Sequence, residues 1–379
     1  MHRATLLSVL TAAAGVLAAG PAPGSMSIDG DAWSELEVEI RGRGLDPESV
    51  GVPPRLTDEM KRWVHSKVPP GTSPDAAFRQ VLVALIDPGG LGLVYDPSVT
   101  GTAEEVWRSR KANCLGFTHL FVGLTREVGI PTYYVRWGWM ERFHREGDLV
   151  LVSGHVSAGW GVGSDREVLE FGAVDGMEAH RSHRISDINA LARHYANRSA
   201  EALRVGLMDE ALVAAETAVT LDPSLVDAWV NLGVSRRRSG DQEGAEAAYR
   251  QATLVDPDHL PAYQNLSIVL RLQGAEDSAQ TMLELLDRRD NKNPYTYLAL
   301  GDQSFDIQRF EEAARYYRRA CRLGRKLAEP RAAMGLTVLE LEDPQAARKW
   351  LKRARAIDPD EGRTQELGRL LSQLEDSSG

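Results

Sequence analysis

The chain has 379 residues, of which 43% are hydrophobic and 26% are charged, and its formal net charge is −10. This length allows two or three domains, each with a core of its own. The net negative charge argues against a nucleic acid or an anionic membrane surface as the main partner. The two cysteines form no CxxC motif, and HExxH and P-loop spacings are missing, so we expect no metal and no cofactor.

The N-terminal stretch MHRATLLSVLTAAAGVLAAGPAPGS predicts a secretory signal peptide over residues 1–25. A short basic start precedes a run of apolar and small residues, which ends in Ala-Ala-Gly-Pro. An uncleaved membrane anchor is the alternative, although the alanine-rich run is short for a membrane span. We therefore expect an exported protein, periplasmic or secreted, whose mature form has no membrane span.

Residues 28–110 are predicted to be mainly helical. Thr102 and Glu105 have the spacing of a capping box, and the helix that they begin ends just before Asn113. Asn113 can then cap the next helix, which places Cys114 in the first turn of that helix.

Cys114 is followed by apolar residues at helical spacing, which predicts an amphipathic helix that ends at Gly129 and Pro131. A thiol at a helix N-terminus faces unpaired N–H groups and the positive end of the helix dipole. Both favour the thiolate, so we expect the pKa of Cys114 to lie below its usual value. The same N–H groups could hold an oxyanion during attack on a carbonyl.

The segment LVLVSGHVSAGWGVGSDREVLEFG predicts two strands around a tight turn. Pairing Trp160 with Asp165 would put His155 opposite Glu170, with their Cβ atoms about 5 Å apart. Glu170 could then orient the imidazole of His155, which could in turn deprotonate Cys114. The alternative is a strand histidine and an edge carboxylate without a catalytic role.

The stretch VYDPSVTGTAEEVWRSRKANCLGFTHLFVGLTREVGIPTYYV, followed by GHVSAGW and VLEFG, resembles the core of the transglutaminase-like superfamily. The resemblance covers about residues 85–175 and implies an α+β papain-like fold with a Cys-His-Asp triad. It implies that Cys114 is the nucleophile and His155 the general base. Glu170 stands where the family has Asp, which puts the orientation of the histidine in doubt, and Asp175 is a less favoured substitute.

The second half of the chain contains a repeat with a period of 34 residues. Pro223 and Pro257 are separated by 34 residues, and Pro257 and Pro359 by 102, which is three such periods. This frame gives five units: 192–225, 226–259, 260–293, 294–327 and 328–361. Small residues recur at the twentieth place (Ala211, Ala245, Ala279, Ala313, Ala347) and, apart from one leucine, at the twenty-seventh (Ala218, Ala252, Leu286, Ala320, Ala354). They would let paired helices approach closely.

The second unit resembles the tetratricopeptide repeat (TPR). It departs from that pattern at Arg236, where the family has Tyr, and it matches at Trp229, Leu232, Gly233, Ala245, Tyr249, Ala252 and Pro257. We therefore predict a transglutaminase-like domain over residues 26–190 and an all-α TPR solenoid over residues 191–361. A capping helix and tail would follow over residues 362–379.

A stack of such repeats has a concave surface that can bind a protein or peptide. The candidate residues there are Val230, Arg237, Gln264, Arg271 and Asp302, and a solvated helical face is the alternative for each. Elsewhere, Cys321 is expected to pack between helices. The histidines from His180 to His183, together with His194, are expected to lie in a solvated linker rather than to bind a metal.

Two functions fit these features. The first is an exported cysteine enzyme that hydrolyses or transfers an amide through a thioester, with the repeats recruiting a protein substrate. The second is a non-catalytic TPR adaptor that carries an inactive transglutaminase-like module.

Overall fold

The computed structural model describes residues 9–11, 33–146, 149–161, 167–169, 171, 182–287 and 293–376. The chain divides into two compact units. The first consists of Met1–Arg142 and Ser153–Ser239, and the second of Phe143–Val152 and Gly240–Gly379. The candidate site lies in the first unit.

The helical N-terminal part that the sequence predicts is present in the first unit. Thr102 and Glu105 form the predicted capping box, because the Thr102 hydroxyl accepts from the Glu105 N–H at 3.2 Å and the Glu105 carboxylate accepts from the Thr102 N–H at 2.8 Å. The helices are α1 (Ser34–Gly42), α2 (Pro47–Val50), α3 (Asp58–Lys67), α4 (Pro74–Ile86) and α5 (Ala103–Ser109). Two short strands, β2 (Val94–Tyr95) before α5 and β3 (Lys111–Ala112) after it, pair in parallel.

Helix α6 (Cys114–Glu127) is the buried helix of the first unit. Its apolar side chains, among them Phe117, Leu120 and Phe121, are at most 1% exposed. Phe121 packs edge-on against Phe78 of α4, with ring centroids 5.0 Å apart. Burial of each such side chain contributes about 2–3 kcal/mol, so α6 is fixed in position by its core contacts.

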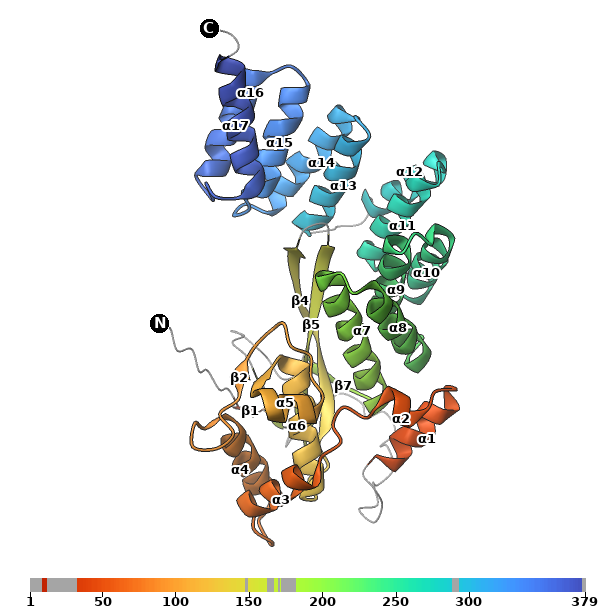
Figure 1. The fold of residues 1–379 in the computed structure, drawn as a ribbon, viewed down its shortest axis with the longest axis vertical. Coiled ribbons are helices and arrows are strands. Elements are labelled where there is room, and N and C mark those ends of the chain that lie inside the picture. The colour runs from red at the N-terminus through yellow and green to blue at the C-terminus, as the bar shows by residue number, and fades with distance from the viewer. Residues whose placement is uncertain are drawn as a thin grey trace. The chain divides into compact units, whose positions relative to one another are not determined.

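A five-stranded sheet, in the order β1-β6-β5-β4-β7, packs with α6. Its two long strands, β4 and β5, are labelled in Figure 1. Its strands are β1 (Val9–Thr11), β4 (Tyr133–Glu146), β5 (Leu149–Trp160), β6 (Glu167–Leu169) and β7 (Ser182–Ile185). β6 pairs antiparallel with both β5 and β1, and β7 pairs antiparallel with β4. β1 falls within the predicted signal peptide.

The register between β5 and β6 differs from the predicted one. Trp160 pairs with Glu167 and Ala158 pairs with Leu169, whereas the sequence placed Trp160 opposite Asp165. The predicted register was wrong by two residues, because β6 begins only at Glu167 and the connection is longer than the tight turn that was assumed. A shift of two residues keeps every side chain on its face of the sheet.

The segment expected to be a solvated linker is partly a strand. Ser182–Ile185 pairs with β4, with Ser182 opposite Trp137 and Ile185 opposite Tyr134. His194 lies in a helix and is only 5% exposed. The linker prediction was wrong here, because the unpaired edge of β4 offers backbone groups that the segment can satisfy as a strand.

A series of helices follows among the described residues. The pairs that lie within one unit are α7 (Asp187–Val205) with α8 (Met208–Leu221), α11 (Leu260–Leu272) with α12 (Glu276–Asp287), α13 (Pro294–Asp306) with α14 (Phe310–Leu323), and α15 (Glu329–Glu340) with α16 (Pro344–Arg355). Between the first two of these pairs along the chain come α9 (Val226–Arg238) and α10 (Gln242–Val255). The final helix is α17 (Gly362–Asp376). α7, α8 and α9 belong to the first unit and α10 to α17 to the second.

The residues at the twentieth and twenty-seventh places of the repeats are buried, as their close helix packing requires. All ten side chains at the twentieth and twenty-seventh places are 0% exposed. At the end of the array, Leu367 and Leu371 of α17 pack on Ala347 and Leu351 of α16. The α+β core followed by an all-α solenoid is therefore confirmed.

Candidate active site

Cys114 is the first residue of α6 and is half-buried. Asn113 caps the helix as predicted, because its side-chain oxygen accepts from the N–H of Gly116 at 2.9 Å. The amide nitrogen of Asn113 donates to the hydroxyl of Thr100 at 2.6 Å, which fixes the orientation of the amide. The cysteine therefore stands at a well-ordered helix start.

The first turn of α6 lies against β5 next to His155. The hydroxyl of Thr118 donates to the carbonyl oxygen of Cys114 at 2.7 Å and lies 3.4 Å from the carbonyl oxygen of Val156. Val156 directly follows His155, which is 8% exposed. One hydroxyl thus joins the backbone of the predicted nucleophile to the strand that carries the predicted base.

Helix α6 covers the side of the sheet that Tyr134 faces. The hydroxyl of Tyr134 lies 2.8 Å from Nδ1 of His119 on α6. On the same side, Phe117 of α6 stacks on Phe171, with ring centroids 3.9 Å apart.

Ser157 and Gly159, which follow His155 on β5, show which side of the sheet the alternate residues of this strand face. The indole of Trp137 donates to the hydroxyl of Ser157 at 2.9 Å, and a Cβ on Gly159 would meet the ring of Tyr133 at 2.4 Å. Ser157 and Gly159 therefore face the side of the sheet opposite α6. Strict alternation would turn His155 to that side as well. For the imidazole to reach Cys114, β5 has to break the alternation at His155, as a β-bulge does.

Glu170, the predicted third member of the triad, lies outside the described residues, and so does Asp175. The carboxylate of the site therefore stays a prediction.

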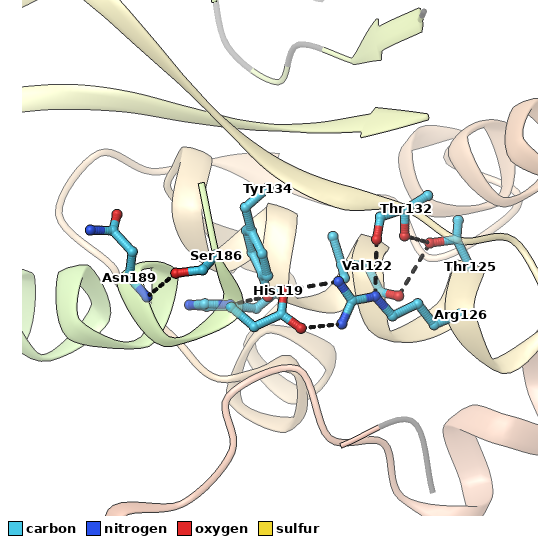
Figure 2. A network of polar contacts seen from close by, with 9 residues as sticks. His119, Val122, Thr125, Arg126, Thr132, Tyr134, Ser186 and Asn189 are labelled. Carbon is cyan, nitrogen blue, oxygen red and sulfur yellow. Dashed lines mark hydrogen bonds and ion pairs between the residues drawn. The ribbon is translucent and has the colours of Figure 1, made fainter. Parts of the chain in front are cut away.

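A network of buried polar side chains surrounds the middle of α6 (Figure 2). These contacts were not predicted from the sequence. The rings of His119 and of His194 on α7 lie 5.3 Å apart. Burial lowers the pKa of His119, and the nearby His194 lowers it further. Burial also lowers the pKa of His194, to about 3, and raises that of Tyr134. Both histidines are therefore neutral at pH 7.

An ion pair attaches the same helix to the start of α7 (Figure 2). The two terminal nitrogens of Arg126 donate to the carboxylate of Asp187 at 2.6 and 2.9 Å, and its Nε donates to the carbonyl oxygen of Thr132 at 3.0 Å. Burial alone would lower the pKa of Arg126, but its hydrogen bonds to Asp187 and the negative charge of that carboxylate more than offset this effect. The first repeat helix is thus fixed to the helix that begins at Cys114.

The second cysteine is a packing residue. Cys321 lies on α14 and is half-buried with a free thiol. Burial raises its pKa to about 11, so this thiol stays protonated at neutral pH.

Two of the predicted residues on the repeat surface are held by their own neighbours. Asp302 accepts from the hydroxyl of Tyr317 at 2.8 Å and from Arg363 of α17 at 2.6 Å. The side chain of Arg271 is 4% exposed and lies 3.6 Å from each of Glu276 and Glu312. These side chains stabilise the array itself.

Within the described ranges, no cluster of three or more acidic, histidine or cysteine side chains could hold a metal ion. Among the helices of these ranges, none is both long and apolar enough to cross a membrane.

Known proteins match the two halves of the chain separately. Residues 87–159 match the model of the transglutaminase-like superfamily, and residues 226–259 match the model of the tetratricopeptide repeat. No curated protein matches the chain.

Several solved structures are similar to about half of this chain. Pseudomonas aeruginosa pilF is 21% identical over 50% of this chain and 87% of its own, with a TM-score of 0.42. YrrB, described as a TPR protein with an unusual peptide-binding site, is 18% identical over 47% of this chain and 92% of its own, with a TM-score of 0.34. A tetratricopeptide repeat protein from Parabacteroides merdae is 16% identical over 49% and 75%, with a TM-score of 0.39. The matches to the two family models show that this chain carries a transglutaminase-like core followed by tetratricopeptide repeats.

Proposed function

We propose that the core is a cysteine enzyme of the transglutaminase-like type that acts on an amide of a protein or peptide. The observation that carries this proposal is the place of Cys114, which is half-buried at the capped start of a buried helix. Thr118 of the same helix lies 3.4 Å from the carbonyl oxygen of Val156, the residue that follows His155 on β5. Backbone N–H groups at such a position favour a thiolate and can hold an oxyanion.

The proposed reaction has two steps. His155 takes the proton of the Cys114 thiol, and the sulfur attacks the amide carbonyl to form a tetrahedral oxyanion. The C–N bond then breaks, the imidazolium returns the proton to the leaving amine, and a thioester remains. Water or a second amine attacks the thioester and frees the sulfur, and we favour water. Glu170 would orient the imidazole.

The repeats would recruit or orient the protein substrate or a partner protein, and the enzyme would act outside the cytoplasm. Solenoids of this kind present extended surfaces to protein ligands. The apolar and small residues of the N-terminus support export.

The rate of alkylation by iodoacetamide as a function of pH tests the proposal without a known substrate. The thiol of Cys114 should titrate well below the reference of about 8.5, and His155→Ala should raise this value. The measurement uses a chain that carries Cys321→Ser, so that Cys114 is the cysteine that reacts. A thiol that titrates at or above the reference would contradict the enzyme.

One observation favours a second function, that of a non-catalytic adaptor. The alternation of Ser157 and Gly159 away from α6 predicts that the side chain of His155 also faces away from the helix that begins at Cys114. An adaptor would show no effect of His155→Ala on alkylation and would keep its bound partners after Cys114→Ser.

A further inference from the structure

Helix α7 contacts the loop between β2 and α5 and the beginning of α5. The backbone N–H of Thr100 donates to the carboxylate of Glu201 on α7 at 2.9 Å, across 101 residues of sequence. A second contact lies nearby, where a terminal nitrogen of Arg198 is 3.8 Å from the carboxylate of Glu105. The first repeat helix therefore contacts both this loop and the helix that follows it.

The same loop holds the cap of α6. Thr100 is 1% exposed, and its hydroxyl accepts from the side-chain amide of Asn113 at 2.6 Å. The backbone is packed equally closely, since a Cβ on Gly116 in the first turn of α6 would meet the backbone nitrogen of Gly101 at 3.1 Å. A displacement of the loop would therefore reach the first turn of α6 directly.

We propose that Glu201 is a positioning residue for Cys114. It acts through Thr100 and Asn113, which cap the helix that begins at the cysteine. The repeat region thereby contributes a side chain to the organisation of the candidate site. This inference rests on the proposed role of Cys114 as a reactive thiol, which it extends.

The capping role and a purely electrostatic role of Glu201 predict opposite effects. Burial raises the pKa of this carboxyl group, and the hydrogen bonds from Thr100 lower it. If its negative charge alone mattered, its removal would favour a thiolate nearby and speed alkylation. If it positions the cap, its removal frays the first turn, disorders the N–H groups that favour the thiolate, and slows alkylation.

The test measures iodoacetamide alkylation of the full-length chain against pH, in a Cys321→Ser background. Glu201→Ala should raise the pKa of Cys114 and slow its reaction at pH 7 about fivefold, the factor that corresponds to the loss of about 1 kcal/mol of cap stability. Glu201→Gln keeps an acceptor for the Thr100 N–H and should restore the wild-type rate. Glu216→Ala on α8 is the matched control, because that residue pairs with Arg236 and should leave the rate unchanged.

A double variant tests the route through the cap. Asn113→Ala should slow alkylation by itself, and the addition of Glu201→Ala should change the rate less than twofold further, because both act on one contact chain. Circular dichroism and thermal melting show that each variant is folded. Glu201→Ala at or above the wild-type rate, or additive effects in the double variant, overturns the inference. A wild-type thiol that titrates near 8.5 contradicts the proposed function instead, and the ratio between variants still reports positioning.

Discussion

Arg126 of α6 and Asp187 at the start of α7 form a two-point ion pair, with nitrogen–oxygen distances of 2.6 and 2.9 Å. The Arg126 side chain is only 4% exposed and that of Asp187 is 22% exposed. The guanidinium also lies over the ring of Trp33, 4.8 Å from its centroid. The first helix of the repeat region is therefore anchored in the same core as the cysteine helix.

Asp187→Asn should lower the free energy of unfolding by about 2–4 kcal/mol, since it leaves the buried guanidinium without its countercharge. Urea unfolding followed by circular dichroism measures the change. Glu104→Gln is the control, because Glu104 pairs with Arg108 at the surface and both side chains are well exposed. That variant should change the free energy by less than about 0.5 kcal/mol. Equal effects of the two variants would contradict the anchoring role of Asp187.

Acid should destabilise the first unit through the two histidines between α6 and α7. Burial lowers the pKa of His119 and lowers that of His194 to about 3, whereas both titrate near about 6.5 in the unfolded chain. Below pH 6.5 the unfolded chain binds protons that the folded chain does not, so the free energy of unfolding falls as pH falls. The slope approaches about 1.4 kcal/mol per pH unit for each histidine.

Thermal melting between pH 7 and pH 4 measures this dependence. His194→Phe should flatten the curve, since it removes one of the two groups and keeps an aromatic ring beside Tyr195. His65→Phe is the control, because the side chain of His65 is 56% exposed. A curve that His194→Phe leaves as steep as that of the wild type would argue against this origin of the pH dependence.

The two cysteines should differ strongly in reactivity. Burial raises the pKa of Cys321 to about 11, so that only a very small fraction is thiolate at pH 7.5. Cys114 is half-buried at a helix start, where N–H groups favour the thiolate. We expect iodoacetamide to label Cys114 at least about a hundredfold faster, as measured by peptide mass spectrometry. Comparable labelling of both cysteines would place Cys114 in an ordinary packing role.

Helix caps and repeat positions were predicted correctly from the sequence, because they depend on the spacing of residues along the chain. The capping box at Thr102 and the cap at Asn113 follow from spacing within one helical turn, and both are present. The buried alanines follow from the 34-residue period, because each repeat must fit the next in the same way.

Contacts between distant segments left no local signal. Thr100 and Glu201 are 101 residues apart, and Arg126 and Asp187 are 61 apart, so no pattern of spacing joins them. The register of β6 failed for a related reason. A tight turn was assumed where a longer connection separates Trp160 from Glu167, and the length of a loop is not fixed by the strands on either side.

Gly301 tests the close packing of the repeats. A Cβ there would meet the ring of Tyr317 at 2.4 Å. That ring is 2% exposed and its hydroxyl donates to Asp302 at 2.8 Å, so it has little freedom to move aside. Alanine is favoured over glycine in a helix by about 1 kcal/mol, but overpacking costs about 1–3 kcal/mol. The cost of overpacking should therefore exceed the gain in helix propensity, and Gly301→Ala should lower the urea midpoint of the full-length chain.

Gly362→Ala is the matched control for this substitution, because a Cβ at that position would meet no atom within 4 Å beyond its chain neighbours and the backbone of its own helix. It should leave the urea midpoint unchanged or raise it slightly, since helix propensity is then the only difference. If Gly301→Ala were equally harmless, Tyr317 would have to move away from Asp302. In that case the Tyr317 ring is already able to move, so the double variant Gly301→Ala with Tyr317→Phe should have the same urea midpoint as Gly301→Ala alone. A ring held by Asp302 instead predicts that removal of the hydroxyl partly restores stability, because the freed ring can shift to make room for the new methyl group.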